Sequence, residues 1–370
     1  MAQRSRVSGG ERVHRLAYAA AHVVMRDGYA DVPHSAGSPG SSDEVAEWID
    51  WDRTFALRER LGRLGFGVAE AMDTAQRFQL GWASAERLIR GTGALRLARG
   101  FCAGAGVDHL ADASDPDELV AGVAHQARVI QQHGGIPVIL PMVPLAARGA
   151  SEDDYVDVYG RIFERSDGPL FVHWLGAMFL PALEGYFPGR SFERVMELAP
   201  DKVRGAKLSL LDRALEVRLR RALLARDQLL LTGDDFHFAR LILGGDGEGD
   251  TAPQPERWTE LGGDRIALGD FSHALLGILD GIAEPASRAL ADLAAGDDAA
   301  YLARMEPCER LSRHLFGAPT EHYKAGLAHL AWRAGLQPNP LLVNHAQRSR
   351  DAEHYRRAEE LAREAGALPS

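Results

Sequence analysis

Short apolar runs alternate with stretches of helical spacing along most of this sequence, and this alternation is the feature that most restricts its fold. Seven runs before residue 235 are predicted strands: Leu16–Met25, Gly67–Met72, Leu97–Gly104, Pro137–Met142, Leu170–Trp174, Val203–Ser209 and Gln228–Thr232. The predicted helices between them include Thr54–Gly65, Ser84–Leu95, Asp117–His133, Asp153–Ser166, Phe192–Leu198 and Leu211–Arg226. Such a pattern is typical of a parallel sheet with crossover helices. The sheet either closes into a barrel or stays open and doubly wound.

An eighth strand would favour the closed barrel. The candidates are Ile266–Leu268 and His273–Leu279. We prefer the later segment, because Pro285 then falls in the first turn of a helix over Glu284–Ala295, where proline is tolerated. The predicted fold is therefore a (β/α)₈ TIM barrel over residues 1–288, which is close to the usual length of about 250 residues plus insertions.

The remaining residues, 289–370, are predicted to form a C-terminal helical appendage. Their helical patterns span Ala300–Leu315, Glu321–Gly335 and Arg348–Ala365. Two segments of the barrel are rich in Gly, Ser, Pro and Asp, so we predict surface loops at about 27–50 and 244–264.

Charge and cysteine content restrict the partners of the chain. The formal net charge is −10 and the basic residues are scattered among acids, which argues against nucleic acid or an anionic membrane as partner. No apolar run approaches the roughly 18 residues of a membrane span. The two cysteines, Cys102 and Cys308, are far apart, as is typical of a reducing compartment. We therefore predict a cytoplasmic protein.

Lysine is rare in this chain, which makes each lysine informative. Only three of the 42 basic residues are lysines: Lys202, Lys207 and Lys324. Lysine can lose its proton and act as a nucleophile, whereas arginine cannot. Lys207 lies within the apolar strand Val203–Ser209, where a charge is costly unless it is used, although its stem could simply pack while its amine reaches solvent. Lys207 is the predicted nucleophile.

Other polar residues follow neighbouring strands, at the end where barrel active sites lie. His173 ends the preceding strand and is the predicted general acid or base, because imidazole titrates near neutral pH. An ordinary structural histidine would have the same pattern. The predicted substrate-binding residues are Asp73, Thr74, Gln76, Trp174 and Asp234. An aspartate after a strand can equally cap the next helix.

Three motifs in sequence order resemble those of one enzyme superfamily. The segment Val203–Asp212, VRGAKLSLLD, is similar to the Schiff-base strand of the dihydrodipicolinate synthase and N-acetylneuraminate lyase superfamily. Pro169–Gly176 resembles its earlier PxxLYNxPG segment, and Thr232–Asp235 resembles its later SGDD segment. The segments AMDTAQR and GDDFHF look more narrowly like a branch described only as dihydrodipicolinate synthase family proteins, with a domain of unknown function. The resemblance implies a TIM barrel and a class I aldolase or lyase.

The departures from these motifs bear on chemistry and substrate. His173 stands where relatives carry a proton-relaying tyrosine, and Asp73 stands in the loop where relatives bind the carboxylate of a 2-oxo acid. Because Asp73 would repel a carboxylate, a keto sugar becomes a second substrate class beside 2-oxo acids. The resemblance also implies a homo-oligomer, either a dimer or a tetramer.

The leading hypothesis is a lyase or dehydratase that acts on a small carbonyl substrate through an iminium on Lys207, with His173 moving the proton. Such chemistry requires no metal and no organic cofactor. One alternative is a metal-dependent isomerase or hydrolase that uses histidines and carboxylates: His22, His109, His173, Asp234 and Glu70. Another is a barrel that binds a ligand without turnover.

Overall fold

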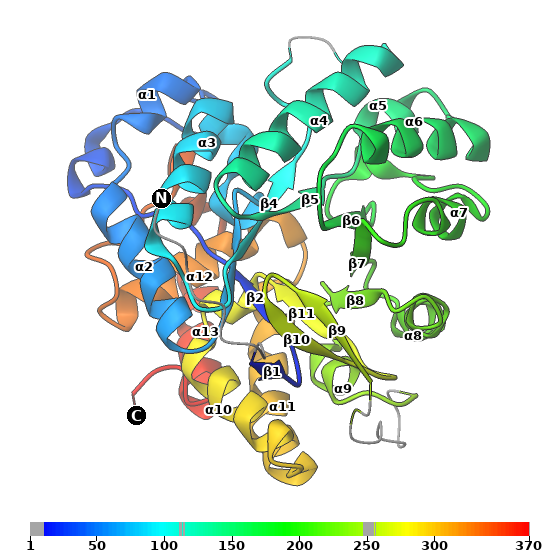
Figure 1. Cartoon of the computed structure of the whole chain (residues 1–370). Helices are drawn as coiled ribbons and strands as arrows, with labels where there is room; N and C mark the ends of the chain where they lie inside the picture. Colours follow the sequence, from blue (N-terminus) through cyan, green and yellow to red (C-terminus); the bar gives the residue numbers. More distant parts are fainter. Residues whose placement is uncertain (1–10, 111–112, 114, 247–254, 256, 370) are drawn as a thin grey trace, which may run out of the picture.

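The computed structural model describes residues 11–110, 113, 115–246, 255 and 257–369, and its centre is a closed eight-stranded barrel (Figure 1). All neighbouring strands pair in parallel, in the order β11-β2-β3-β4-β5-β6-β7-β8. The strands are β2 (Ala17–Ala20), β3 (Gly67–Glu70), β4 (Phe101–Ala105), β5 (Ile136–Ile139), β6 (Leu170–Leu175), β7 (Val203–Ser209), β8 (Leu229–Thr232) and β11 (His273–Leu276). The predicted TIM barrel is confirmed, and the later candidate for its eighth strand is correct.

Helices surround the barrel on its outer face (Figure 1). They are α1 (Ser42–Ala46), α2 (Trp51–Arg63), α3 (Arg77–Leu95), α4 (Pro116–Gln132), α5 (Val143–Ala147), α6 (Glu152–Glu164), α7 (Ser191–Glu197), α8 (Arg213–Leu224), α9 (Phe238–Leu243) and α10 (Ala283–Ala294). Side chains define where several of them begin. Ser151 forms a capping box with Asp154 at α6, and Asp212 accepts a hydrogen bond from Leu215 N at α8. Such caps satisfy backbone N–H groups that have no partner within the helix.

Strand alternation sorts side chains between the barrel interior and the helix layer. Along β6, Phe171 belongs to the interior apolar cluster, whereas Val172 and Trp174 pack in the cluster between strands and helices. Side chains along a strand alternate between its two faces. His173 therefore lies on the same side as Phe171, inside the barrel.

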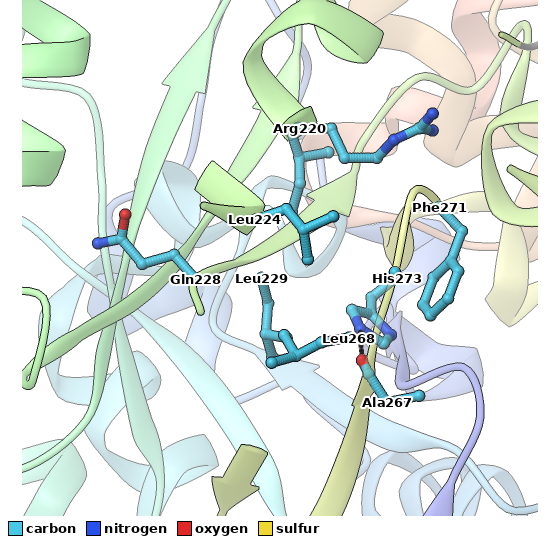
Figure 2. A pocket seen from close by; sticks show the side chains of 10 residues that line it. Arg220, Leu224, Gln228, Leu229, Ala267, Leu268, Phe271 and His273 are labelled. Carbon is cyan, nitrogen blue, oxygen red and sulfur yellow. Dashed lines mark hydrogen bonds between the residues drawn. The ribbon is translucent and has the colours of Figure 1, made fainter. Parts of the chain in front are cut away.

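A small sheet that the sequence analysis missed covers the end of the barrel where the strands begin. It pairs β1 (Arg12–Val13), β10 (Asp264–Leu268) and β9 (Arg257–Leu261). Its apolar side chains join the interior cluster of the barrel: Val13, Leu261, Ile266 and Leu268. A small cavity of about 10 Å³ lies beside this sheet, and its lining includes Leu229, Leu268 and His273 (Figure 2). His273 connects this sheet to the barrel. Leu16 N donates to its Nδ1 at 2.9 Å, and its Nε2 lies 3.1 Å from Ala267 O.

Both segments that were predicted as surface loops contain helices or strands. In the segment 244–264, β9 and the start of β10 replace the expected loop, while residues 247–254 and 256 lie outside the described residues. The segment 27–50 contains η1 (Asp27–Asp31) and α1, and it buries Tyr29. Composition predicted a loop because Gly, Ser and Pro are frequent there, but a few buried apolar side chains are enough to fix such a segment.

The C-terminal helices α11 (Asp298–Leu315), α12 (Tyr323–Arg333) and α13 (Ala352–Glu364) pack on the barrel (Figure 1). They share its main apolar cluster through side chains of each helix, including Met305, Leu327 and Leu361. The predicted boundary at residue 288 falls within α10, and the division of the chain into two parts stays a prediction.

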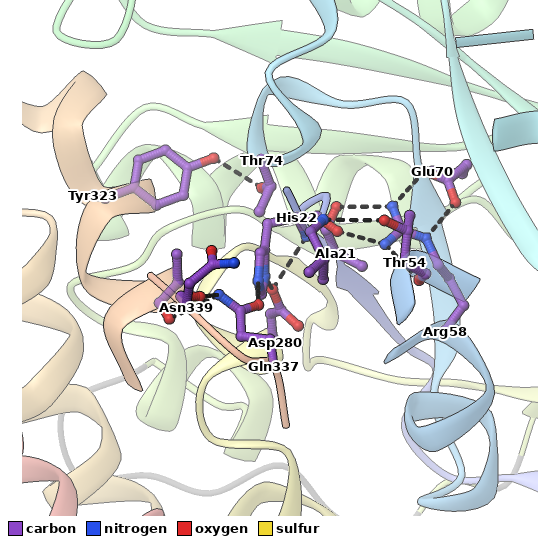
Figure 3. Close-up of polar contacts among 12 residues, drawn as sticks. Ala21, His22, Thr54, Arg58, Glu70, Thr74, Asp280, Tyr323, Gln337 and Asn339 are labelled. Atoms are coloured by element: carbon purple, nitrogen blue, oxygen red, sulfur yellow. Dashed lines mark hydrogen bonds and ion pairs between the residues drawn. The ribbon is translucent and has the colours of Figure 1, made fainter. Parts of the chain in front are cut away.

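Three buried polar side chains connect this C-terminal part to the barrel (Figure 3). His22 follows β2, Asp280 lies in the turn η4 (Ile278–Asp280) after β11, and Gln337 follows α12. His22 Nδ1 contacts Asp280 Oδ2, and His22 Nε2 lies 2.6 Å from Gln337 Oε1. Gln337 Nε2 donates to the carbonyls of Ala328 and Asn339, so Oε1 must accept from the ring. Both ring nitrogens therefore donate, which requires an imidazolium.

This imidazolium predicts a pH-dependent stability. Burial opposes its charge, but Asp280 and the two hydrogen bonds outweigh burial, so the pKa of His22 is raised above 6.5 despite the nearby Arg58 guanidinium. The pKa of Asp280 is lowered below 3.8, because His22 and Arg58 outweigh its burial. A raised folded-state pKa gives stability that is complete below pH 6.5 and is lost as the pH rises through that pKa.

We therefore expect the melting temperature of the wild type to fall relative to that of His22→Gln as the pH rises above 6.5. Thermal scans of both proteins, with His133→Gln as a matched histidine control, measure this difference. Parallel pH profiles for the wild type and His22→Gln would contradict the imidazolium assignment.

Candidate active site

Lys207 lies on β7 inside the barrel, toward the end where the strands finish. It pairs in register with His173 of β6 and Leu231 of β8. Among the described residues, no hydrogen-bond partner of its amine is present. Burial lowers the pKa of Lys207 below 10.5, although the charges of Asp235, Cys102 and Asp73 oppose this change. A lowered pKa favours the neutral form of a lysine, which is the form that can act as a nucleophile.

Gly233 makes room for this amine. A Cβ atom at position 233 would lie 2.8 Å from Lys207 Cε and would also collide with Ser209 Oγ. The Gly233 N–H donates to Leu208 O at 2.6 Å, which fixes the end of β8 against β7. Any larger residue at this position would displace the lysine side chain.

His173 is the neighbour of Lys207 on β6. Its Nε2 lies 3.2 Å from Ser209 Oγ, while its buried Nδ1 has no partner among the residues described. Burial, and then the charge of Lys207, lower the pKa of His173 well below 6.5. The ring is therefore neutral at physiological pH and lies within the cluster around Lys207.

Two adjacent aspartates follow β8 and have different surroundings. Asp234 Oδ1 accepts from the N–H groups of Phe236 and His237, and its Oδ2 lies 2.9 Å from His237 Nδ1. Asp234 thus has the capping contacts of an ordinary turn residue. Asp235 is buried, and its Oδ1 has no hydrogen-bond partner among the described residues. Burial raises the pKa of Asp235 to about 8, against the effect of Lys207.

The C-terminal helix α12 brings two residues that the sequence analysis did not place in the site. Tyr323, at its first position, has its hydroxyl 2.8 Å from Thr74 Oγ1 after β3, and its ring stacks on Phe316 (Figure 3). Lys324 Nζ donates to Asp73 Oδ2 at 2.7 Å. Lys324 is only 6% exposed, whereas the Asp73 side chain is 53% exposed, so the carboxylate of this pair reaches the surface. Nothing local in the sequence indicates these contacts, because about 250 residues separate the partners.

The structure places two other predicted substrate-binding residues in different surroundings. Gln76 has its amide bonded at both ends to the backbone of Val343, which connects the loop after β3 to the C-terminal segment. Trp174 lies on the outer side of β6, where its ring packs 4.9 Å from that of Phe192 and 5.4 Å from that of Phe187. The structure therefore places His173 next to Lys207 and joins Thr74 and Asp73 to α12, whereas Gln76 and Trp174 contact other parts of the chain.

The residues named for the metal-dependent alternative lie apart from one another. Glu70 faces the helix layer and forms a buried ion pair with Arg58, at 2.9 Å between Glu70 Oε2 and Arg58 Nε. His22 belongs to the network with Gln337, and His109 lies beside Gln126 on the outer side of the barrel. Within the part of the chain that the structure describes, no three His, Cys, Asp or Glu side chains are grouped so that they could hold a metal ion.

Comparison with known proteins agrees with this architecture. The family described as "Protein of unknown function (DUF993)" matches residues 2–370, so the chain belongs to that family. No curated protein matches the sequence significantly. The described part of the chain has no helix that is both long and apolar enough to cross a lipid bilayer.

Solved structures of the dihydrodipicolinate synthase family share the fold. Dihydrodipicolinate synthase from Oceanobacillus iheyensis has a TM-score of 0.62 at 15% identity, over 95% of this chain and 97% of that chain. A putative dihydrodipicolinate synthetase from Pseudomonas aeruginosa has a TM-score of 0.62 at 14% identity, over 95% and 99%. YagE from Escherichia coli K12, a prophage protein of the same family in complex with pyruvate, has a TM-score of 0.59 at 14% identity, over 98% and 100%. The predicted resemblance to this family is confirmed at the level of the fold.

Proposed function

We propose that this protein is a class I lyase of the aldolase kind, in which Lys207 forms an iminium with a small carbonyl substrate. The observation that carries this proposal is the Lys207 amine, which lies inside the barrel without a hydrogen-bond partner among the described residues and whose pKa burial lowers. An arginine or a solvated lysine could not supply a neutral amine at physiological pH. Trapping the iminium with borohydride and mapping the modified peptide tests the proposal directly.

The substrate classes we propose are 2-oxo acids and keto sugars. The Asp73 carboxylate alone would disfavour a substrate carboxylate, but Lys324 neutralises it at 2.7 Å. With this pairing the loop has no net charge at that position, so it no longer repels the carboxylate of a 2-oxo acid. Binding of pyruvate and of dihydroxyacetone, measured by their effect on the melting temperature, distinguishes the two classes.

Around the iminium, His173 and the Thr74–Tyr323 pair are the groups we propose for moving protons at the substrate. His173 is neutral and has an unpartnered Nδ1 among the described residues. Thr74 and Tyr323 form a hydroxyl pair in which either oxygen can donate. Hydroxyls in such a pair pass a proton without a net charge having to be buried.

Tyr323→Phe is expected to lower turnover by roughly 10²-fold, near the lower end of the range for a proton-transfer group. The variant keeps the stacking on Phe316 and loses only the hydroxyl, so its melting temperature should change little. Tyr301→Phe is the matched control, because the Tyr301 hydroxyl donates to Ala239 O in the helix layer. Equal activity in both variants would remove Tyr323 from the mechanism.

A further inference from the structure

Asp235 follows the strand next to the one that carries Lys207, and its carboxyl group has a buried oxygen without a partner among the described residues. It follows β8, the strand that pairs with β7, and it is only 4% exposed. The backbone N–H of Ile278, in the turn η4 after the next strand, lies near enough to favour the carboxylate form. The Asp235 Oδ1 atom is buried and has no hydrogen-bond partner among the described residues. A buried carboxyl oxygen without a partner is costly, and its presence calls for an explanation.

The Lys207 amine is the complementary charge, although no ion pair joins it to Asp235 in the described part of the chain. Its strongest electrostatic contact is with Asp235, and Lys207 is likewise the charge that most favours the Asp235 carboxylate. Two groups that influence each other in this way titrate as a pair, and with one proton the pair is either ammonium with carboxylate or amine with carboxylic acid. The pair is neutral overall in both forms, so the exchange of this proton buries no net charge.

The neighbouring residues Asp234 and His173 are less suited than Asp235 to exchanging a proton in this site. Both Asp234 oxygens accept hydrogen bonds within their own turn or from His237. His173 Nε2 is occupied by Ser209, and protonation of the ring would add a second cation beside Lys207. Neither residue combines a buried oxygen that lacks a partner among the described residues with an electrostatic influence on the amine as strong as that of Asp235.

We propose that Asp235 is the acid–base residue that gives a proton to, and takes it back from, the oxygen that leaves when Lys207 forms its iminium. This inference rests on the proposed function of Lys207. In the first step the neutral amine attacks the carbonyl carbon, the nitrogen proton moves to the carbonyl oxygen, and a neutral carbinolamine results. The Asp235 carboxylic acid then protonates the hydroxyl, which leaves as water while the nitrogen lone pair forms the C=N bond.

The products of this step are an iminium cation, water and the Asp235 carboxylate. The cation and the carboxylate replace the neutral amine and the carboxylic acid of the starting state. The carboxylate is then the counter-ion of the iminium. Hydrolysis reverses the same events, and the carboxylate takes back a proton from the attacking water. No co-reactant beyond the carbonyl substrate and water is required.

The decisive experiment is the pH dependence of iminium trapping with cyanoborohydride, using pyruvate and dihydroxyacetone as probes. In the wild type, a pair that titrates together predicts a bell-shaped dependence of the rate on pH, because a second proton removes the nucleophile and loss of the last proton removes the acid. Asp235→Asn keeps the size of the side chain and one oxygen that can accept a hydrogen bond, but it cannot give a proton. We expect its trapping rate to fall roughly 10²- to 10⁴-fold and to lose the decline on the alkaline side.

A second measurement needs no substrate. Acetic anhydride labelling of Lys207, followed by peptide mass spectrometry across the same pH range, reports the titration of the amine. Loss of the Asp235 carboxylate should lower the apparent pKa of Lys207 in Asp235→Asn, since the carboxylate favours the ammonium form. Asp235→Ala provides the same readouts if the asparagine variant does not fold.

The outcomes separate the two proposals. Failure to trap any adduct on Lys207 in the wild type rejects the lyase proposal and this inference together. An adduct in the wild type with an unchanged bell-shaped profile in Asp235→Asn, or an unchanged Lys207 titration, rejects the role of Asp235 alone. Asp234→Asn is the matched control. Its trapping profile should keep the alkaline decline, because the Asp234 carboxylate accepts hydrogen bonds within its own turn.

Discussion

Replacement of Lys207 with methionine is expected to abolish both the borohydride-trapped adduct and turnover while the fold stays intact. Methionine has a similar length and no charge, so the variant avoids burying a cation in the barrel. Loss of the nucleophile removes the covalent route entirely, and we expect the rate to fall by at least about 10³-fold. Incubation with pyruvate or dihydroxyacetone, reduction and peptide mass spectrometry measure the adduct, and a thermal scan measures the fold.

Lys202 is the control for this experiment. Its Nζ donates to the carbonyls of Phe163 and Ser166 near the start of β7, at the opposite end of that strand from the candidate site. Lys202→Arg should keep adduct formation at the wild-type level. Lys324 cannot serve as a second remote control, because its amine is paired with Asp73 close to the candidate site. Modification of Lys202 and Lys207 to equal extents would contradict a Schiff-base site and would favour a barrel that binds its ligand without covalent chemistry.

The barrel was predictable because its strands and helices have local signals. Each barrel strand is a short apolar run, and the order of the runs along the chain is also their order around the barrel. The sheet of β1, β10 and β9 was not predictable in this way. Its first strand has only two residues, Arg12–Val13, and pairs with residues about 250 positions later. No window of sequence contains both partners, so no periodicity marks the pairing.

The candidate site was only partly predictable, for the same reason. Lys207 and His173 are polar residues within apolar strands, and that conflict with local preference is visible in the sequence. The dipeptide Asp234-Asp235 pointed to a carboxylate, but only the contacts of each oxygen distinguish the turn residue from the unsatisfied one. Tyr323 reaches Thr74 from a helix that sequence patterns assign to packing, since the position of α12 on the barrel depends on tertiary contacts.

The largest effect on stability is expected at the buried ion pair between Arg58 of α2 and Glu70 of β3 (Figure 3). Both side chains are fully buried, and Glu70 also accepts from Thr92 Oγ1 at 2.7 Å and from its neighbour Ala71 N. Arg58 donates in addition to the carbonyls of Ala21, His22 and Thr54. The pair therefore connects α2 and α3 to the ends of β2 and β3.

Glu70→Gln leaves the Arg58 guanidinium buried without its counter-ion, and we expect it to lower the free energy of unfolding by about 3–5 kcal/mol. Arg58→Met should be similarly damaging, because it leaves the carboxylate unpaired and three backbone carbonyls without their donor. The double variant Arg58→Met/Glu70→Leu has no unpaired charge to bury. Its loss should therefore be clearly smaller than the sum of the two single losses, which urea unfolding of the four proteins would measure as a coupling free energy.

The same series separates stability from catalysis. Glu70 faces the helix layer and not the barrel interior, so trapping of the Lys207 adduct should persist in Glu70→Gln at temperatures where the variant is folded. Arg356→Met on α13 is the matched control, since its ion pair with Glu353 is on the surface and should have no measurable effect on unfolding. Additive losses in the double variant would show that Arg58 and Glu70 act independently, and that the cost of each substitution comes from packing.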